Sequence, residues 1–240
     1  MFGRSTLLLL ASLASSQAVA AADSSDTRQN RLIVDNYATC VLGMHSREVA
    51  QVVLSNPGNE NIIRHHPSLI DGSCLVQAGG ARMEMPGDTL LYALSEALVR
   101  WEYSKGLPPD IAHAAPLQHV NPNPPLITAI NGKPLNPKKL EQLKAAQAKE
   151  TGFQVMSVFG ECVAREDPHH SLALILTKVA SKEEDQALAD LNPALAKCVP
   201  SGQTVALDRD AVRGTIAMNL YRLAKAPRIA AVDPAKPTVR

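Results

Sequence analysis

Apolar residues recur at helical spacing through most of the chain. Val155, Val158, Phe159, Cys162 and Val163 stand at positions i, i+3, i+4, i+7 and i+8, which places them on one face of a helix. Ala and Leu are the dominant residues, and both favour helix over sheet. The pattern therefore predicts a mainly α protein, with these five residues on the apolar face of one of its helices.

Capping signals divide the second half of the chain into several helices. Asp167 followed by proline is typical of an N-cap and a first turn. Ser181 with Glu184 has the spacing of a capping box. The Asn-Pro pair at 192–193 interrupts that helix and restarts it for about a turn. Asp208 is expected to cap the last helix.

Two stretches of the chain correspond at a shift of 122 residues. The segment 37–41 (YATCV) aligns with 159–163 (FGECV), and 94–100 (LSEALVR) aligns with 216–222 (IAMNLYR). The first cysteine and the final arginine are 60 residues apart in both stretches. The chain is therefore expected to contain one unit written twice.

The duplicated unit predicts the organisation of the whole chain. We expect two tandem helical repeats, 29–104 and 138–225, of about four helices each, with short β-hairpin elements. A proline-rich linker, 105–137, joins them, because eight of the seventeen prolines lie there and proline breaks a helix. Turns or short strands are expected near 77–85 and 199–207, and 226–240 is expected to be a loose tail.

A hairpin is predicted inside the linker. The segment LITAINGKPL places Asn131-Gly132 between apolar residues, which favours a type I′ turn. The same segment resembles the strand-turn-strand part of PDZ domains over about 25 residues, but the helical flanks favour a simple hairpin. A proline-rich ligand for the aromatic groove of a partner is an alternative interpretation of the linker.

Four cysteines occupy similar places in the two units. In an exported chain this pattern predicts two disulfides, and of the three possible pairings symmetry favours Cys40–Cys74 and Cys162–Cys198. Closing a loop of about 35 residues stabilises a fold by roughly 3–4 kcal/mol. A catalytic thiol or a cysteine-rich metal site is the alternative, disfavoured because the chain has no C-x-x-C.

The first residues predict export. Arg4, a leucine-rich centre and Ala18-Val19-Ala20 form the pattern of a signal peptide, residues 1–21. No later apolar run is long enough to span a bilayer, so a soluble periplasmic or secreted protein is expected. Without its signal the chain is formally neutral and has no block of basic residues, which argues against nucleic acid as a partner.

Histidines and arginines are the candidates for chemistry. Six of the seven histidines are the two adjacent pairs, His65-His66 and His169-His170, and His113 and His119 in the linker. Neighbouring helical residues diverge, so such pairs chelate poorly, and surface or helix-start roles are favoured over a metal site assembled across segments. Arg100 and Arg222 end the two units, where arginine suits a helix C-terminus.

The order of these features resembles a group of exported bacterial proteins of uncharacterised function. The shared features are aromatic-x-x-Cys-Val, a proline-started helix, a second cysteine and a closing L-x-x-x-L-[YV]-R, over residues 37–100 and 159–222. The resemblance implies the doubled plan and no activity.

The expected function is that of a non-catalytic structural or interaction protein with an unknown protein partner in the cell envelope and no cofactor. The chain contains no G-x-S-x-G, Walker loop, dinucleotide fingerprint or H-E-x-x-H motif. Two alternatives stay open: a protein that binds a transition metal through histidines, and a hydrolase whose site is assembled between the repeats. Whether the protein is an enzyme is thus undecided, with a non-enzyme favoured.

Overall fold

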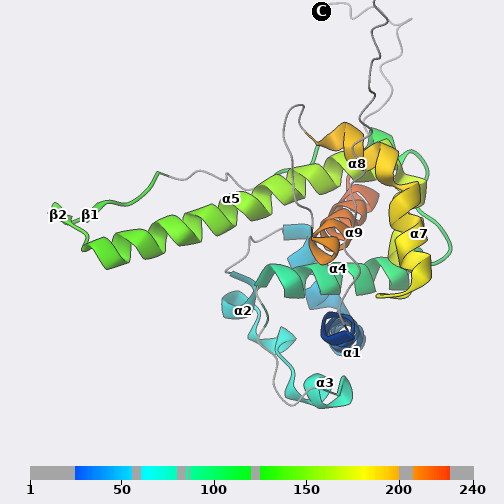
Figure 1. The fold of residues 1–240 in the computed structure, drawn as a ribbon, viewed down its shortest axis with the longest axis horizontal. Coiled ribbons are helices and arrows are strands. Elements are labelled where there is room, and N and C mark those ends of the chain that lie inside the picture. The colour runs from blue at the N-terminus through cyan, green and yellow to red at the C-terminus, as the bar shows by residue number, and fades with distance from the viewer. Residues whose placement is uncertain are drawn as a thin grey trace, which may run out of the picture.

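The computed structural model describes residues 25–55, 61–79, 85, 87–119, 125–199 and 208–227, and these are mainly helical (Figure 1). The α-helices are α1 (Ser25–Ser55), α2 (Asn61–His65), α3 (Gly72–Gln77), α4 (Gly87–Tyr103), α5 (Pro137–Glu166), α6 (Pro168–Leu176), α7 (Lys182–Asp190), α8 (Asn192–Cys198) and α9 (Arg209–Lys225). The described part also holds the 3-10 helices η1 (Pro67–Leu69) and η2 (Ile111–His113), and an antiparallel pair of strands, β1 (Ala129–Ile130) and β2 (Lys133–Pro134).

Parts of the sequence prediction lie outside the described residues. These are the signal peptide, most of the turns predicted near 77–85 and 199–207, and all but the first two residues of the predicted tail. Within the described ranges, no helix combines the length and the apolar character that crossing a bilayer requires.

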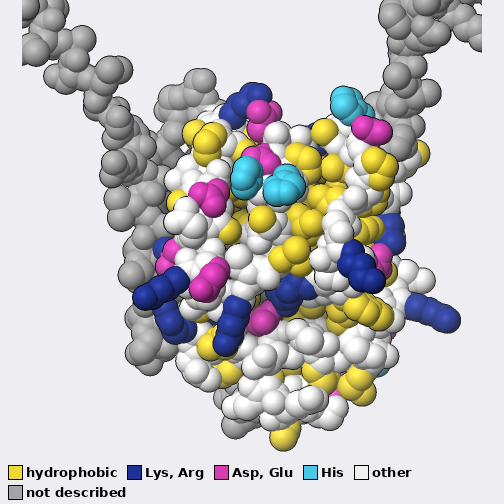
Figure 2. All heavy atoms as spheres, turned by 90° about the vertical axis from the view of Figure 1, so that its right-hand side faces the viewer, with side chains coloured by type: hydrophobic (Ala, Val, Ile, Leu, Met, Phe, Trp, Pro, Cys, Tyr) yellow, Lys and Arg dark blue, Asp and Glu magenta, His cyan; other side chains and the backbone are white. Residues whose placement is uncertain are grey.

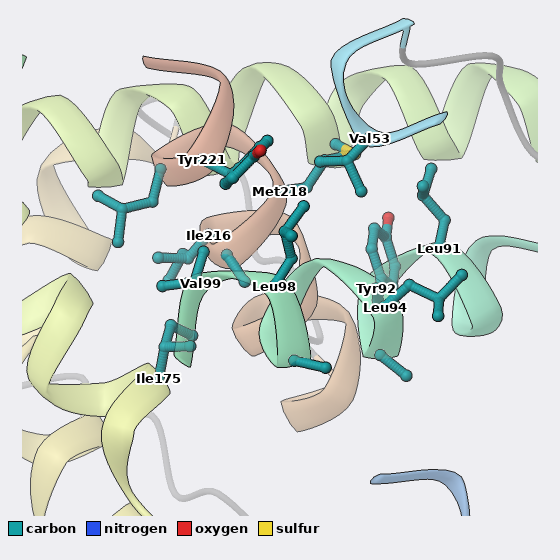
Figure 3. Packing of buried hydrophobic residues seen from close by; sticks show 14 of the residues in the cluster. Val53, Leu91, Tyr92, Leu94, Leu98, Val99, Ile175, Ile216, Met218 and Tyr221 are labelled. Carbon is teal, nitrogen blue, oxygen red and sulfur yellow. The ribbon is translucent and has the colours of Figure 1, made fainter. Parts of the chain in front are cut away.

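Two helices, α4 and α9, form the centre of the protein. Every residue from Val212 to Ala224 in α9 is buried, and so is every residue from Leu90 to Val99 in α4. A helix that is buried all round must be covered by other elements. Here α1 packs on α4, α5 packs on α9, and α6 packs on both. One hydrophobic core therefore joins residues from both predicted repeats (Figure 3).

Glycines allow α9 to approach α4 and α5 closely. A Cβ atom at Gly214 of α9 would lie 2.1 Å from the Cβ atom of Tyr92 on α4. A Cβ atom at Gly160 of α5 would lie 2.5 Å from the carbonyl oxygen of Thr215 on α9. Any side chain at these two positions would force the helices apart.

Two disulfides tie short helices to the long ones. Cys40–Cys74 joins α1 to α3, with Cα atoms 5.5 Å apart, and Cys162–Cys198 joins α5 to α8, with Cα atoms 5.8 Å apart. This is the pairing that symmetry favours, and it uses all four cysteines of the chain. Each bond fixes a helix too short to be stable alone.

Helix boundaries coincide at a spacing of 122 residues. Helix α9 begins and ends 122 positions after α4. Helix α1 is interrupted at His45, whose backbone is not helical (φ −127°, ψ 34°), and 122 positions later Asp167 separates α5 from α6. The correspondence found in the sequence thus extends to three helix boundaries.

The predicted N-caps are confirmed. The side chains of Asp167, Ser181 and Asp208 accept hydrogen bonds from backbone N–H groups in the first turns of α6, α7 and α9. The second half of the predicted capping box is wrong. Glu184 does not bond back to the cap residue; its carboxylate accepts from the N–H of Ala180 and enters a buried ion network.

The predicted apolar face of α5 is only partly the buried one. Phe159 and Val163 are buried, but Val155 and Val158 are more than half exposed. The buried face of α5 includes several small residues instead: Ser157, Gly160 and Ala164. Small residues bring the α9 backbone close to α5, and this packing outweighs the preference of valine for the interior.

The proline-rich linker packs on the body. Ile111 and Ala114 are buried. The guanidinium group of Arg165 on α5 donates hydrogen bonds of 2.8–3.0 Å to the carbonyl oxygens of Ala112, Ala114 and Ala115. A side chain supplies these donors in a segment where prolines limit regular backbone pairing.

The predicted hairpin is present. Asn131 (φ 51°) and Gly132 (φ 74°) both have positive φ, as a type I′ turn requires. The pair β1–β2 is the only sheet in the described part of the chain, and helix α5 follows it. The segment is therefore a simple hairpin and not part of a PDZ domain.

The hairpin and the first half of α5 project from the body (Figure 1). No residue from 126 to 152 is buried, and the first buried residue of α5 is Phe153. We call residues 126–152 the arm. Its helix starts at the N-cap Asn136 and Pro137, and its 16 residues extend about 24 Å at the usual rise per residue.

Candidate functional site

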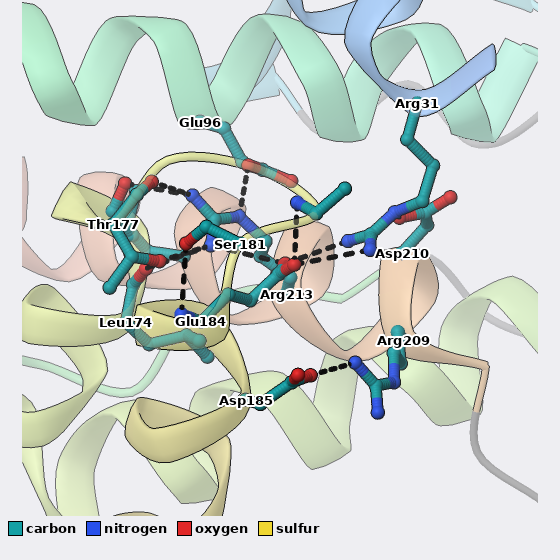
Figure 4. A network of polar contacts seen from close by, with 12 residues as sticks. Arg31, Glu96, Leu174, Thr177, Ser181, Glu184, Asp185, Arg209, Asp210 and Arg213 are labelled. Carbon is teal, nitrogen blue, oxygen red and sulfur yellow. Dashed lines mark hydrogen bonds and ion pairs between the residues drawn. The ribbon is translucent and has the colours of Figure 1, made fainter. Parts of the chain in front are cut away.

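Arg213 of α9 lies at the centre of a buried polar network (Figure 4). Its side chain is fully buried and donates to the carbonyl oxygens of Leu174 (2.9 Å), Ile175 (3.0 Å) and Thr177 (2.8 Å). These carbonyls lie at the C-terminal end of α6, where the last turn leaves carbonyl groups without a helical donor four residues on; that of Leu174 also accepts from the N–H of Thr177. Arg213 therefore caps α6 from inside the protein.

The same network contains two buried carboxylates. Arg213 Nε lies 2.5 Å from Glu96 Oε2, and Arg213 Nη1 lies 3.2 Å from Glu184 Oε1. Glu184 also accepts from both terminal nitrogens of Arg31, at 2.7 and 3.1 Å, and Arg31 contacts Asp210. The network joins α1, α4, α7 and α9.

Each buried charge in the network has a partner of opposite sign. Burial raises the pKa of Glu96, while Arg213 and Arg100 oppose that shift. Burial would lower the pKa of Arg213, but the charges of Glu96 and Glu184 outweigh it and raise the pKa. Because unpaired ions are costly in the interior, the network holds four helices in one arrangement.

A cavity of about 420 Å³ opens beside this network, between elements of both predicted repeats. Such a volume is typical of small-ligand sites. Helices α1, α4 and α9 contribute most of its lining, with apolar side chains such as Val34 and Ala93 between charged ones. The charged side chains are Arg31, Asp35, Asp88, Glu96, Asp208 and Asp210.

The carboxylates of the cavity are engaged in structural contacts. Asp35 pairs with Arg100, and Asp208 accepts from two N–H groups at the start of α9. Burial raises the pKa of Asp210, against the effect of Arg31. The lining holds five acidic side chains and one basic one, but arginines pair with Asp35, Glu96 and Asp210. Most of the remaining negative charge therefore comes from Asp88 and Asp208, near the start of α4 and α9.

A second polar cluster joins the linker to α5. His119 Nδ1 lies 3.0 Å from Ser157 Oγ, and His119 Nε2 lies 2.5 Å from Glu161 Oε2. An ionised carboxylate can only accept, so Nε2 carries a proton, and in the neutral imidazole Nδ1 accepts from the serine hydroxyl. This is the order of hydrogen bonds in a Ser-His-Asp triad.

Burial and further hydrogen bonds restrain this cluster. Ser157 is 0% exposed, in the middle of α5. Burial would raise the pKa of Glu161, but hydrogen bonds from His119, the N–H of Leu117 and Arg165 lower it to about 2. The cluster holds the linker on α5 by charge-assisted bonds, and its hydroxyl faces no solvent.

The other predicted histidines do not converge. His65, His113 and His169 are exposed. His66 pairs with Glu48 at 3.1 Å, and His170 pairs with Asp167 at 2.6 Å. No group of three or more His, Cys, Asp or Glu in the described ranges is arranged to hold a metal ion.

On the face of the body shown in Figure 2, acidic and basic side chains are interspersed around apolar ones.

Arg100 and Arg222 bind different partners. Arg100 pairs with Asp35 and, at 3.5 Å, with Glu96. Arg222, almost fully buried, donates to Asn219 Oδ1 at 3.0 Å and to the carbonyl oxygen of Gln118. Both arginines therefore connect their helix to another segment, and their role is not limited to the helix C-terminus.

Sequence reasoning missed Arg31, Arg213 and Ser157, and it assigned Glu184 to a capping box rather than to the buried network. One signal was present, since Glu96 and Arg213 interrupt helices that are otherwise mostly apolar or small. A charge at such a position needs a buried partner.

No family model matches the chain, and neither the curated proteins nor the solved structures contain a match.

Proposed function

We propose that this chain is an exported, non-catalytic interaction protein of the cell envelope that makes its contacts through the arm. The observation on which this rests is that residues 126–152 project from the body and bury no side chain. The body supplies a rigid base, because α5 continues from the arm into the core at Phe153.

Without a partner, the arm combines weak local stability with apolar side chains exposed to water. A two-stranded hairpin and a 16-residue helix are each marginal in isolation. The tip exposes two large apolar side chains, Ile127 (59%) and Ile130 (57%). The short β1–β2 pair also leaves an unpaired strand edge, which can pair with another chain. These features favour a contact surface.

Export is supported by the two disulfides. Such bonds persist in oxidising compartments and are rare in the cytosol. The signal-peptide pattern of the first 21 residues points the same way.

Photo-crosslinking in the native cell tests the role of the arm. A photoreactive amino acid replaces Gln142, which is exposed on the arm, and in a control strain it replaces Ala196, which is exposed on α8. We expect adducts from position 142 and none from position 196. Absence of adducts from the arm, in cells where the protein is exported and folded, would contradict the proposal.

We also infer that the chain arose by duplication of one unit. The support is threefold: the shared boundaries of α4 and α9, the break at His45 that corresponds to Asp167, and the disulfides that each join a long helix to a short one. Superposition of residues 37–55 and 87–103 on the residues 122 positions later tests this inference.

One observation favours a hydrolase as a second candidate. Ser157, His119 and Glu161 have the hydrogen-bond order of a catalytic triad. The buried hydroxyl argues against it, since a nucleophile must reach its substrate. Labelling with a fluorophosphonate probe separates the two functions. We expect no difference between the wild type and Ser157→Ala, and labelling that depends on Ser157 would favour the hydrolase.

A further inference from the structure

We propose that the partner of the arm is a second copy of this chain, and that the arm of one molecule docks on the acidic cavity of the next. This inference rests on the proposed function and names its partner. The inference rests on the opposite charges of the arm and the cavity, which are separate surfaces of the same molecule.

The arm is basic. Its exposed lysines are Lys133, Lys138, Lys139, Lys144 and Lys149, against two acidic residues, Glu141 and Glu150. The arm thus has a formal charge of +3 in a chain whose total is only +1. Leu140 and Leu143, one turn apart and half-buried, add apolar surface between the lysines.

The cavity is acidic, although Asp35 and Glu96 pair with Arg100 and Arg213, which lie outside its lining. Five carboxylates and one guanidinium group line it. Asp208 is exposed and the side chain of Asp210 is 49% exposed, so negative charge faces solvent. The apolar side chains of Val34 and Ala93 lie among these charges. A basic helix with leucines on one side matches both the charge and the apolar surface of this site.

In this structure the arm cannot contact the cavity of its own molecule. Figure 1 shows the arm directed away from α1, α4 and α9. Helix α5 packs against α9, α8 and α6. The cavity is lined instead by α1, α4 and the start of α9. The complementary surfaces therefore meet only between molecules.

Such a contact joins two different surfaces, so it is heterologous. A heterologous contact leaves a free arm at one end and a free cavity at the other, and it continues into a ring or a filament. Because the attraction is largely between charged groups near solvent, it weakens with salt.

Two variants with complementary defects test this assembly. The first, Lys138→Glu/Lys139→Glu, reverses charge on the arm. The second, Asp88→Asn/Asp208→Asn, removes two of the five acidic charges of the cavity, and asparagine at 208 remains a good N-cap for α9. A matched control, Arg47→Glu/Lys105→Glu, makes the same charge change as the arm variant at exposed positions elsewhere. Circular dichroism and thermal unfolding verify that each purified protein is folded.

Analytical ultracentrifugation gives the outcome. We expect the mature wild type and the control to form oligomers at about 0.05 M salt that dissociate at about 0.5 M. Each test variant alone should associate at least about tenfold more weakly. An equimolar mixture of the two should form a heterodimer and nothing larger, because one intact arm then meets one intact cavity.

A monomeric wild type at low salt would overturn the inference, and so would a mixture that stays monomeric while the wild type assembles. If the wild type is monomeric but position 142 still gives adducts with another protein in cells, only the identity of the partner is wrong. If position 142 gives no adducts at all, the proposed function is wrong as well.

Discussion

Gly214 of α9 lies directly against Tyr92 of α4, and the two residues are 122 positions apart. They occupy corresponding positions of the two halves of the sequence. Contact between a position and its own counterpart is the arrangement expected where two copies of one helix meet about a twofold axis. The contact thus agrees with the proposed duplication and shows how closely the two central helices pack.

Replacing Gly214 by alanine should destabilise the protein markedly. The added Cβ would overlap the side chain of Tyr92, and overpacking of a core costs about 1–3 kcal/mol or more. Chemical denaturation of the wild type and of Gly214→Ala measures the change in unfolding free energy.

Gly152→Ala is the matched control, because Gly152 is exposed on α5 and a Cβ there meets no atom within 4 Å. Alanine should stabilise this helical position by about 0.5–1 kcal/mol. Equal effects of the two substitutions would contradict the close packing of α4 and α9.

Glu184→Gln should destabilise the protein by about 3–5 kcal/mol, because Arg31 and Arg213 would lose a shared buried counter-charge. Urea unfolding at neutral pH measures the loss. The neighbouring substitution Glu183→Gln makes the same charge change at an exposed site and should have a much smaller effect. A small effect at both positions would show that the network contributes little.

The stability of the protein should fall as acid protonates Glu161. The folded pKa is about 2, below the ordinary value of 4.5, so the carboxylate stabilises the fold fully above pH 4.5. This contribution is lost progressively as the pH falls from 4.5 through 2. Unfolding free energy measured across this range should decline less steeply for Glu161→Gln than for the wild type.

At neutral pH, Glu161→Gln should be less stable than the wild type by about 1–3 kcal/mol, because the bonds from His119, Arg165 and the N–H of Leu117 lose their ionised acceptor. Glu141→Gln serves as the control, since Glu141 is 71% exposed. Parallel pH profiles for Glu161→Gln and the wild type would exclude this role of Glu161.

Removing either disulfide should lower the stability of the whole protein. Replacing both cysteines of one pair by serine should cost about 2–5 kcal/mol. Because the core is continuous across both halves, calorimetry should still record a single transition, shifted to lower temperature. Two separate transitions in either variant would mean that the halves unfold independently.

The sequence predicted the helical content, the N-caps and the hairpin, because these depend on local chemistry. Asp167 and Ser181 act through bonds within one turn, and Asn131-Gly132 needs only its own backbone preference. The face of α5 was predicted less well. Which side of a helix is buried depends on its neighbour, and the small residues of the buried face matter more than the exposed valines.

The polar networks could not be predicted from spacing. Arg31 and Glu184 are 153 positions apart, and Arg213 and Glu96 are 117 apart. Only the packing of α1, α4, α7 and α9 brings these charges together. The linker similarly gave no sign that His119 would meet Ser157 and Glu161, because that contact requires the linker to fold back along α5.

Among the described elements, α9 is both the most enclosed helix and the last that the ribosome produces. Until residues 209–225 emerge, α4, α5 and α6 lack the partner on which they close. Most domains begin to fold at their N-terminal part during synthesis, whereas the core of this protein stays incomplete until residues 209–225 are made. A chain without a complete core can still pass through a narrow pore in an extended form, which agrees with the proposed export.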